Sequence, residues 1–376
     1  MIKIPIYKPC IGDAEKKLVN EALDDGWISS KGKFIEEFEN KFAKYVNRKH
    51  AISAVNGTAA LHMAIESLNL PKNSAIICPT LTYVASANSI RHAGLIPLFV
   101  DCNEFGLSEA DQIKIGLEFA NSNNINVSAI MPVHLYGNCC NINEIKEFGI
   151  PIIEDCAESA GSTIDGKVSG SHDTEFACFS FFGNKTITTG EGGMVVSNND
   201  ELAIKCKMFR NVGQNPTSQQ RYQHLIAGHN YRLTNIASAI GIAQLDKIDK
   251  ILSKKEYIAQ LYRKHLKDIE KENILLSNPQ NCVSNNWLIT IILESNIMRE
   301  SLMLYLEANG IETRPVFLPM HAIINLSTFY KIDDMKISEK LSSCGINLPS
   351  YPDLKDEQVE FICNKIKEFY EKYNKH

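Results

Sequence analysis

The stretch HAISAVNGTAALHMAIESLNLPKNSAIICPTLTYVASANSIRHAGLIPLFV, residues 50–100, alternates short apolar runs with segments of helical periodicity. Three runs, HAISAV, AIICP and IPLFV, have the length and composition of buried strands. The segments between them, TAALHMAIESLN and VASANSIRHAG, repeat apolar residues at three- and four-residue spacing, which is typical of helices. Strands that alternate with helices predict a largely parallel sheet with helices on both faces. Ligands of such sheets bind at the carboxyl ends of the strands.

The same alternation extends to about residue 200 through the runs NVSAIMPVH, PIIED, EFACFSF and GMVVSN. The first fifty residues instead predict two amphipathic helices, and residues 234–268 predict one long helix. A strand-like NWLITIILE, a helix-like MRESLMLYLEANG, a strand-like IETRPVF and a helix-like DEQVEFICNKIKEFYEKY follow. We therefore expect an α/β fold with a large domain over residues 1–249 and a smaller C-terminal α/β domain over residues 250–376.

The composition is that of an ordinary globular protein, with 44% hydrophobic residues among 376 and a formal net charge of −5. This mixed balance gives no reason to expect a nucleic acid or an anionic membrane as partner. The eleven cysteines form no CxxC pair and several lie in apolar runs, so we expect free thiols in a reducing cytoplasm. The N-terminus has no signal-peptide core, and no apolar stretch approaches the ~20 residues of a membrane helix. The histidine spacing predicts no metal site.

Lys185 lies in FSFFGNKTITTGEGG, residues 179–193, between an aromatic run with the pattern of a buried strand and a cluster of glycines. Burial disfavours the charged form of a lysine and lowers its pKa. A neutral amine can form a Schiff base with an aldehyde cofactor. The alternative is a lysine that extends from a strand end into solvent. The choice between the two interpretations depends on which other side chains lie in the same pocket as Lys185.

Two carboxylates, Asp155 and Glu158, follow the strand predicted for PIIED. Asp155 would lie at the same edge of the sheet as Lys185, where it could keep the ring nitrogen of a pyridine cofactor protonated. Glu158 could hydrogen-bond the ring oxygen of that cofactor. The alternatives are a helix-capping role for Asp155 and a first-turn helix position for Glu158.

The junction NGTAAL, residues 56–61, is a candidate phosphate site. Gly57 permits close backbone approach, and Thr58 with the free N–H groups of a helix start suits a phosphate. Such junctions are common, and the chain has neither a Walker A loop nor a GxGxxG fingerprint. Tyr83 follows another strand and could stack on a planar cofactor, with a core aromatic as the alternative. His134 also ends a strand, and its role stays open between a pocket residue and a structural hydrogen-bonder.

Six motifs occur in this chain in the same order as in the DegT-type PLP-dependent nucleotide-sugar aminotransferases. They are NGTAALHMAI, PTLTYVASANSI, HLYGN, IEDCAES, FSFFGNKTITTGEGGMVV and HNYRLTNIASAIGIAQL. The chain resembles this family over nearly its whole length, and FFGNKTITTGEGGMVV is the most specific part of the match. The resemblance implies an aspartate-aminotransferase-like fold (fold type I) and pyridoxal 5′-phosphate (PLP) as cofactor. It also implies a homodimer with active sites at the subunit interface, with a tetramer of two such dimers as the alternative.

The resemblance further implies roles for residues matched by motif. Lys185 would bind the cofactor covalently and move protons between cofactor and substrate, Asp155 would bind the pyridine nitrogen, and Glu158 would bind the ring oxygen. The other implied cofactor contacts are Gly57, Thr58 and Ser180 at the phosphate, Tyr83 on the ring, and Asn230 from the neighbouring subunit. The implied sugar-nucleotide contacts are Arg314, in ETRPVF, and His321, in PMH. His229 stands before Asn230, where relatives often carry tyrosine.

The implied substrates are L-glutamate and a nucleotide-linked 4-keto-6-deoxy sugar of surface-polysaccharide synthesis. GDP-4-keto-6-deoxymannose is expected, and a dTDP- or UDP-linked 4-keto-6-deoxyglucose is the alternative. Two other classes fit less well. A dehydratase of the same family carries histidine in place of Lys185, and a regulatory protein of this fold usually has a fused DNA-binding segment.

Overall fold

The computed structural model describes residues 3–216, 222–267, 269, 277–323 and 328–373. Its helices are α1 (Asp13–Asp24), α2 (Lys33–Tyr45), α3 (Gly57–Leu68), α4 (Val84–His92), α5 (Ala110–Ser122), α6 (Ile142–Lys146), α7 (Asp200–Arg210), α8 (Asn235–Asp246), α9 (Ile248–Leu266), α10 (Asn296–Ala308), α11 (Lys336–Cys344) and α12 (Asp356–Tyr373). Two short 3₁₀ turns, Leu135–Gly137 and Met320–Ala322, lie in the connections.

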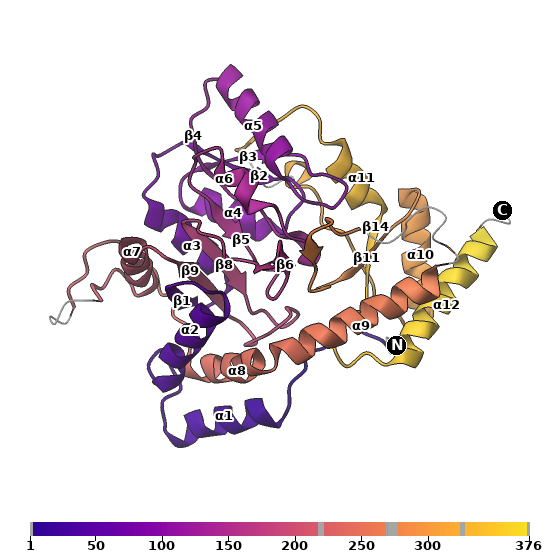
Figure 1. The fold of residues 1–376 in the computed structure, drawn as a ribbon, viewed down its shortest axis with the longest axis horizontal. Coiled ribbons are helices and arrows are strands. Elements are labelled where there is room, and N and C mark those ends of the chain that lie inside the picture. Colours follow the sequence, from indigo (N-terminus) through magenta and orange to yellow (C-terminus); the bar gives the residue numbers. More distant parts are fainter. Residues whose placement is uncertain (1–2, 217–221, 268, 270–276, 324–327, 374–376) are drawn as a thin grey trace.

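The strands form one extended central sheet and two smaller sheets (Figure 1). They are β1 (His50–Ala54), β2 (Ala75–Pro79), β3 (Ile96–Val100), β4 (Val127–Ile130), β5 (Ile153–Asp155), β6 (Thr163–Ile164), β7 (Lys167–Val168), β8 (Phe176–Ser180), β9 (Gly193–Ser197), β10 (Cys282–Val283), β11 (Ile289–Ile292), β12 (Arg314–Pro315), β13 (Tyr330–Lys331) and β14 (Gly345–Leu348). The seven strands expected before residue 200 are all present.

The central sheet has the order β1-β9-β8-β5 on one side and β4-β2-β3-β13 on the other. Two parallel bridges, Ile130 to Ile152 and Val133 to Asp155, join the two halves between β4 and β5. Only β9 runs antiparallel to its neighbours β1 and β8 within these described strands, and the other pairs are parallel. The prediction of a largely parallel sheet is therefore confirmed.

Helices cover the sheet because packing against it buries their apolar faces away from water. One layer is aromatic: Phe38 and Phe42 of α2 contact Phe181, and Phe42 packs edge-on against Phe179 of β8 at 4.9 Å between ring centres. The helix α3 is buried almost all round, because it packs against β8, β9, α4 and α7. These contacts fix the start of α3 and the end of β8 beside each other.

The expected long helix over residues 234–268 is wrong, because two helices meet at Lys247. The backbone of Lys247, with φ −114° and ψ 13°, is not helical. Gln244 Nε2 and Lys247 Nζ both donate to the carbonyl of Cys10, at 2.8 and 2.7 Å, and so tie this junction to the N-terminal segment. In Figure 1, α8 lies beside α1 and α2, whereas α9 continues towards α12.

The C-terminal region has its own sheet, β11-β14-β12, with antiparallel neighbours. A separate buried cluster joins this sheet to α9, α10 and α12. The strand expected for IETRPVF is only two residues long, Arg314–Pro315. The predicted division at residues 249 and 250 falls in the first turn of α9 and stays a prediction. Among the described residues, none of the helices combines the length and the apolarity needed to cross a membrane.

Candidate active site

A cavity of about 390 Å³ lies at the carboxyl ends of β1, β5 and β8. Its wall includes Gly57, Thr58, Tyr83, Asp155, Glu158, Ser180, Lys185 and Arg314, which are eight of the ten residues expected at the site. Tyr7 from the N-terminal segment and Trp287, Phe317 and Asn347 from the C-terminal region close the other side. The strand topology thus brings the separate motifs into one pocket.

Lys185 is largely buried, and both its backbone and its amine make contacts with other residues. Its side chain is 13% exposed, and Nζ lies 3.8 Å from the centre of the Trp287 ring and 3.6 Å from Glu158 Oε1. Tyr7 donates its hydroxyl to the Lys185 carbonyl at 2.6 Å, and Trp287 Nε1 donates to the Asn184 carbonyl at 2.7 Å. Burial lowers the pKa of the Lys185 amine, with partial opposition from Glu158 and Asp155. This is not a solvated lysine at a strand end.

Asp155 is the last residue of β5 and is 4% exposed. Its carboxylate accepts from Ser86 Oγ at 2.7 Å and from the backbone N–H of Ala157 at 3.1 Å. Burial raises the pKa of Asp155, and these two hydrogen bonds oppose the rise. No helix begins in the described residues 156–162, so the helix-capping alternative for Asp155 and the first-turn alternative for Glu158 are both wrong.

Glu158 links the amine of Lys185 to the backbone beyond β4. Its Oε2 accepts from the N–H of Tyr136 at 2.8 Å, and its Oε1 faces Lys185 Nζ. Burial raises the pKa of Glu158 to about 7, although the charge of Lys185 opposes this rise. Glu158 can therefore gain or lose a proton near neutral pH, next to an amine whose pKa is lowered.

The start of α3 forms a polar cradle beside the cavity. Asn56 caps this helix by accepting from the N–H of Ala59 at 2.8 Å, and α3 follows β1 after only two residues. A Cβ at Gly57 would lie 2.8 Å from Ser180 Cβ, so only glycine allows the helix start and the end of β8 to approach this closely. The free N–H groups of a helix start favour an anion such as a phosphate.

Tyr83 and Arg314 stand at the open side of the cavity. Tyr83 is 57% exposed and its ring centre lies 5.6 Å from that of Phe317, so it is not a core aromatic. The Arg314 side chain is 54% exposed, with Nη2 3.6 Å from Glu312 Oε1. Both side chains can therefore move to meet a ligand.

Asn230 and His321 do not line the cavity within one chain. Asn230 is exposed and pairs with Asn211 through a backbone bridge. His321 hydrogen-bonds Thr80 Oγ1 through Nδ1 at 2.7 Å, while its Nε2 lies 3.2 Å from Glu339 Oε1. The roles expected for these two residues stay predictions.

His134 is a structural hydrogen-bonder, which resolves the choice left open by its position. Its Nδ1 accepts from the N–H of Cys140 at 3.0 Å, so Nε2 carries the proton and donates to Glu154 at 3.2 Å. Neither His134 nor Glu154 lines the large cavity.

Sequence reasoning missed three residues that orient the site: Tyr7, Ser86 and Trp287. Each acts on a predicted residue through a contact between distant parts of the chain. The only sequence signal was the scarcity of tryptophan, of which the chain has two.

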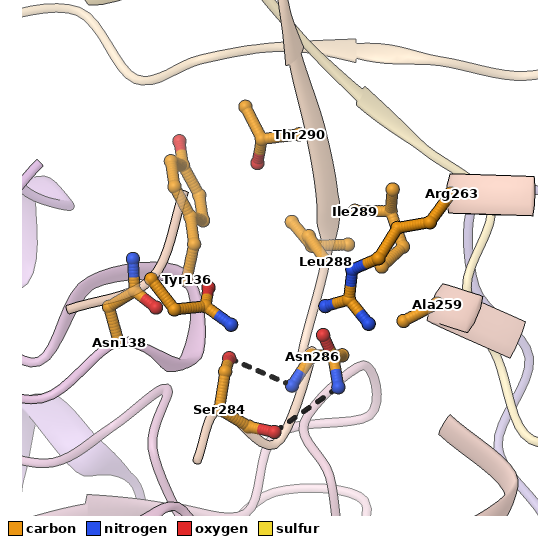
Figure 2. A pocket seen from close by; sticks show the side chains of 10 residues that line it. Tyr136, Asn138, Ala259, Arg263, Ser284, Asn286, Leu288, Ile289 and Thr290 are labelled. Atoms are coloured by element: carbon orange, nitrogen blue, oxygen red, sulfur yellow. Dashed lines mark hydrogen bonds between the residues drawn. The ribbon is translucent and has the colours of Figure 1, made fainter. Parts of the chain in front are cut away.

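A second cavity, of about 40 Å³, lies between Tyr136 and α9 (Figure 2). Its wall is mostly polar and includes Arg263 and Asn286. The backbone N–H of Asn286 donates to Ser284 Oγ, and its Nδ2 donates to the Ser284 carbonyl, at 3.1 Å each. This volume suits one or two water molecules, and none of the predicted site residues lines it.

Comparison with known proteins agrees with this geometry. The model of the DegT/DnrJ/EryC1/StrS aminotransferase family matches residues 9–367. The chain is 41% identical to the GDP-perosamine synthase of Vibrio cholerae, over 98% of this chain and 99% of the relative. It is 42% identical to the GDP-perosamine synthase of Escherichia coli O157:H7, over 98% of both.

The fold also matches a solved aminotransferase. PseC of Helicobacter pylori, an aminotransferase of pseudoaminic acid biosynthesis, superposes with a TM-score of 0.88 at 25% identity. The match covers 98% of this chain and 99% of that structure. The aspartate-aminotransferase-like α/β fold expected from the sequence is therefore confirmed.

The cavity fits PLP by the chemistry of its donors. Asp155 is a buried carboxylate whose hydrogen-bond partners in the described chain, Ser86 Oγ and the N–H of Ala157, are both uncharged, which suits a protonated pyridine nitrogen. The start of α3 suits the phosphate, and the partly neutral amine of Lys185 suits the aldehyde carbon. The family match spans residues 9–367 and therefore includes nearly all of the residues that line this cavity. The chain belongs to the DegT/DnrJ/EryC1/StrS aminotransferase family.

Proposed function

We propose that this chain is a PLP-dependent aminotransferase that transfers the amino group of L-glutamate to C4 of GDP-4-keto-6-deoxy-D-mannose. The products are 2-oxoglutarate and GDP-perosamine, a precursor for surface-polysaccharide (O-antigen) synthesis. The observation that carries the reaction type is the buried Lys185 facing Glu158 and Asp155 in a single cavity. The similarity to two GDP-perosamine synthases along nearly the whole chain supports the choice of substrate.

Bound PLP supplies the electron sink that allows a proton to leave and return at neighbouring carbons. The chain supplies the base for these transfers. Lys185 has a lowered pKa because it is buried, so its amine is available to take up a proton. The nearby Glu158, with a pKa raised to about 7, can hold a proton in the same range. Asp155 holds the ring nitrogen in its protonated form, and Ser86 keeps Asp155 in place.

Trp287 limits where the amine of Lys185 can move. Its ring lies 3.8 Å from Nζ, and its own N–H is bound by the carbonyl of Asn184, next to Lys185 in the chain. The ring also excludes water from one side of the amine. Exclusion of water disfavours the charged form of the amine, and the ring leaves the open part of the cavity for it to move into.

The alternative substrate is a dTDP- or UDP-linked 4-keto-6-deoxyglucose, which gives a viosamine-type product by the same chemistry. The exposed Arg314 is the expected contact to the nucleotide sugar, together with His321. An arginine binds a diphosphate of any nucleotide, so the choice between the bases depends on other contacts.

The active enzyme is a homodimer in this proposal, with Asn230 reaching the phosphate site of the neighbouring subunit. Large apolar side chains that are at least half exposed support a covered surface on this chain. Among those in the described chain are Ile11, Leu23, Trp27 and Ile28 around α1, and Tyr222 and Leu225 in the segment before Asn230. A partner subunit that covers these side chains would also bring Asn230 to the cavity of its neighbour.

Mass spectrometry of the reaction products tests the proposal. PLP-loaded protein is incubated with L-glutamate and, in parallel, with GDP-4-keto-6-deoxymannose or dTDP-4-keto-6-deoxyglucose. We expect an amino sugar only from the GDP-linked substrate, and none from the Lys185→Ala variant. An amine only from the dTDP-linked sugar would keep the reaction type and overturn the substrate. No amine from either sugar, with 2-oxoglutarate still formed from glutamate, would limit the proposal to its first half-reaction.

A further inference from the structure

A group of three potential ligands joins α3 to the segment before α8, and none of the three lines the cavity. His62 and Glu66 are one turn apart on this helix, and His229 comes from the segment before α8. One ligand atom of each residue lies within 4.8 Å of those of the other two. His62 is 4% exposed, whereas Glu66 and His229 are half-buried, so an ion could reach the group from solvent.

The decisive feature is the ring of His62. Its Nδ1 lies 3.0 Å from the hydroxyl of Tyr231, with which it shares a hydrogen bond. Its Nε2 is buried and has no hydrogen-bond partner among the described residues, although Glu66 Oε1 is only 3.4 Å away. The hydrogen bond with Tyr231 is compatible with either tautomer of His62. When Nδ1–H donates to Tyr231, the lone pair of Nε2 faces the Glu66 carboxylate, and a cation between these two acceptors would remove their repulsion.

The separation of two of the three ligand atoms fits a tetrahedral metal ion. Zn²⁺ binds imidazole nitrogen and carboxylate oxygen at about 2.0–2.2 Å, which places two ligands of a tetrahedron about 3.3–3.5 Å apart. The 3.4 Å between His62 Nε2 and Glu66 Oε1 matches that separation. A metal-bound histidine commonly donates its other ring N–H to a fixed acceptor, and Tyr231 occupies that place for His62.

The third ligand is positioned by the backbone. His229 donates its N–H to Phe209 O at 2.7 Å and accepts from the N–H of Val212 at 2.8 Å, so it is tied to the end of α7. Its ring stacks on Tyr231 at 4.7 Å between centres, and its centre lies 5.0 Å from that of His62. A neutral imidazole offers Nε2 as a metal ligand when its Nδ1 carries the proton.

A second histidine-containing group in the described chain lacks these properties. His134, Glu154 and Cys156 are all fully buried, and both ring nitrogens of His134 already have partners. Burial also raises the pKa of the Cys156 thiol well above its usual value, which disfavours the thiolate that a metal needs. The comparison favours the first group.

We propose that His62, Glu66 and His229 bind one Zn²⁺ ion per chain, with water in the fourth position. The ion would join α3, whose start forms the phosphate cradle, to the segment that carries Asn230. The site lies outside the catalytic cavity and does not depend on the proposed sugar substrate.

Zinc binding to the tag-free, PLP-loaded protein tests this proposal directly. The protein is freed of metal with a chelator and titrated with Zn²⁺ by calorimetry, and Co²⁺ is used in parallel as an absorption probe of tetrahedral coordination. The His229→Tyr variant is expected to fold, because it keeps an aromatic ring that can stack on Tyr231. Removal of this ligand should weaken Zn²⁺ binding by at least about 10- to 100-fold, the loss typical of an outer-sphere partner.

Two further variants complete the design. Glu66→Gln keeps the shape of the side chain but removes the charge, and it should also weaken Zn²⁺ binding. His224→Gln changes a histidine of the same segment outside the group, and it should bind Zn²⁺ as the wild type does. Absence of micromolar Zn²⁺ binding in the wild type would overturn the proposal. Equal binding by the wild type and His229→Tyr would overturn it as well, because the ion would then be held elsewhere.

Discussion

At the scale of a single residue, the environment of Lys185 predicts both covalent cofactor binding and catalysis. The Lys185→Ala variant should keep PLP only by non-covalent contacts and should lose turnover by at least about 100-fold, since it lacks the base. Treatment with borohydride followed by intact-mass measurement detects the covalent bond. The wild type should gain the mass of reduced cofactor and the variant should not. Full turnover by Lys185→Ala would contradict the assignment of the whole site.

Lys255 is a second buried lysine, and it provides a test by pH. Its Nζ donates to the carbonyls of Ser350 and Trp287 at 2.7 and 3.2 Å, and burial lowers its pKa to about 7. Between pH 7 and the usual lysine pKa near 10.5, the unfolded chain binds more protons than the folded chain at this group. The free energy of unfolding should therefore rise with pH in this window, by up to about 1.4 kcal/mol per pH unit.

The variant Lys255→Met isolates this effect. Its stability should be compared with that of the wild type by denaturant unfolding of the holoenzyme at pH 7 and pH 9. We expect the wild type to gain stability relative to Lys255→Met as the pH rises. The exposed Lys250→Met on the same helix serves as control and should show no such change. A difference between wild type and Lys255→Met that is constant with pH would mean that Lys255 is charged at pH 7 in the folded chain.

At the scale of the element, the start of α3 depends on the absence of a side chain at Gly57. A methyl group there would lie 2.8 Å from Ser180 Cβ, so the helix start or β8 has to shift. Gly57→Ala should cost about 1–3 kcal/mol of stability, as overpacking does, and should weaken PLP binding. Fluorescence titration with PLP and thermal unfolding measure both. Gly183→Ala is the control, because its methyl group would find no atom closer than 3.9 Å.

The local sequence pattern predicted helices and strands well where apolar residues kept one spacing over the whole element. Seven buried strands up to β9 and the helices α3 and α4 followed from alternating runs, because burial on both faces requires such runs. The break between α8 and α9 was missed because nothing in the local period marks Lys247. Its position is fixed by the carbonyl of Cys10, more than two hundred residues away in the chain. The short β12 was missed for a related reason, since two residues of pairing leave no periodic signal.

The site was also predictable only in part, because some of its residues are positioned by contacts between distant parts of the chain. Lys185, Asp155, Gly57 and Ser180 sit at strand ends, and a parallel sheet brings such ends together. Tyr7 belongs to the N-terminal segment and Trp287 to the C-terminal region, and both contact Lys185 only through tertiary packing. The spacing of residues along the sequence does not predict such contacts. Ser86 lies inside α4, where a serine gives no sign that it faces a carboxylate of another strand.

At the scale of the whole molecule, the position of Asn230 makes a prediction about assembly. Within one chain Asn230 is exposed and outside the cavity, so it can serve the site only across a subunit interface. Asn230→Ala and Lys185→Ala should each form weakly active or inactive homodimers. In a heterodimer of the two, one site combines the Lys185 of one chain with the Asn230 of the other.

Mixing of the two variants therefore distinguishes the arrangements. Equal amounts, unfolded together and refolded with PLP, should recover about a quarter of the wild-type activity, because half of the dimers are mixed and one of their two sites is intact. The mixture is compared with each variant treated alone and with the refolded wild type. If Asn230 acted within its own chain, both sites of the mixed dimer would carry a defect and no activity would return. Recovery thus requires that a complete active site be built from two subunits, with Lys185 from one and Asn230 from the other.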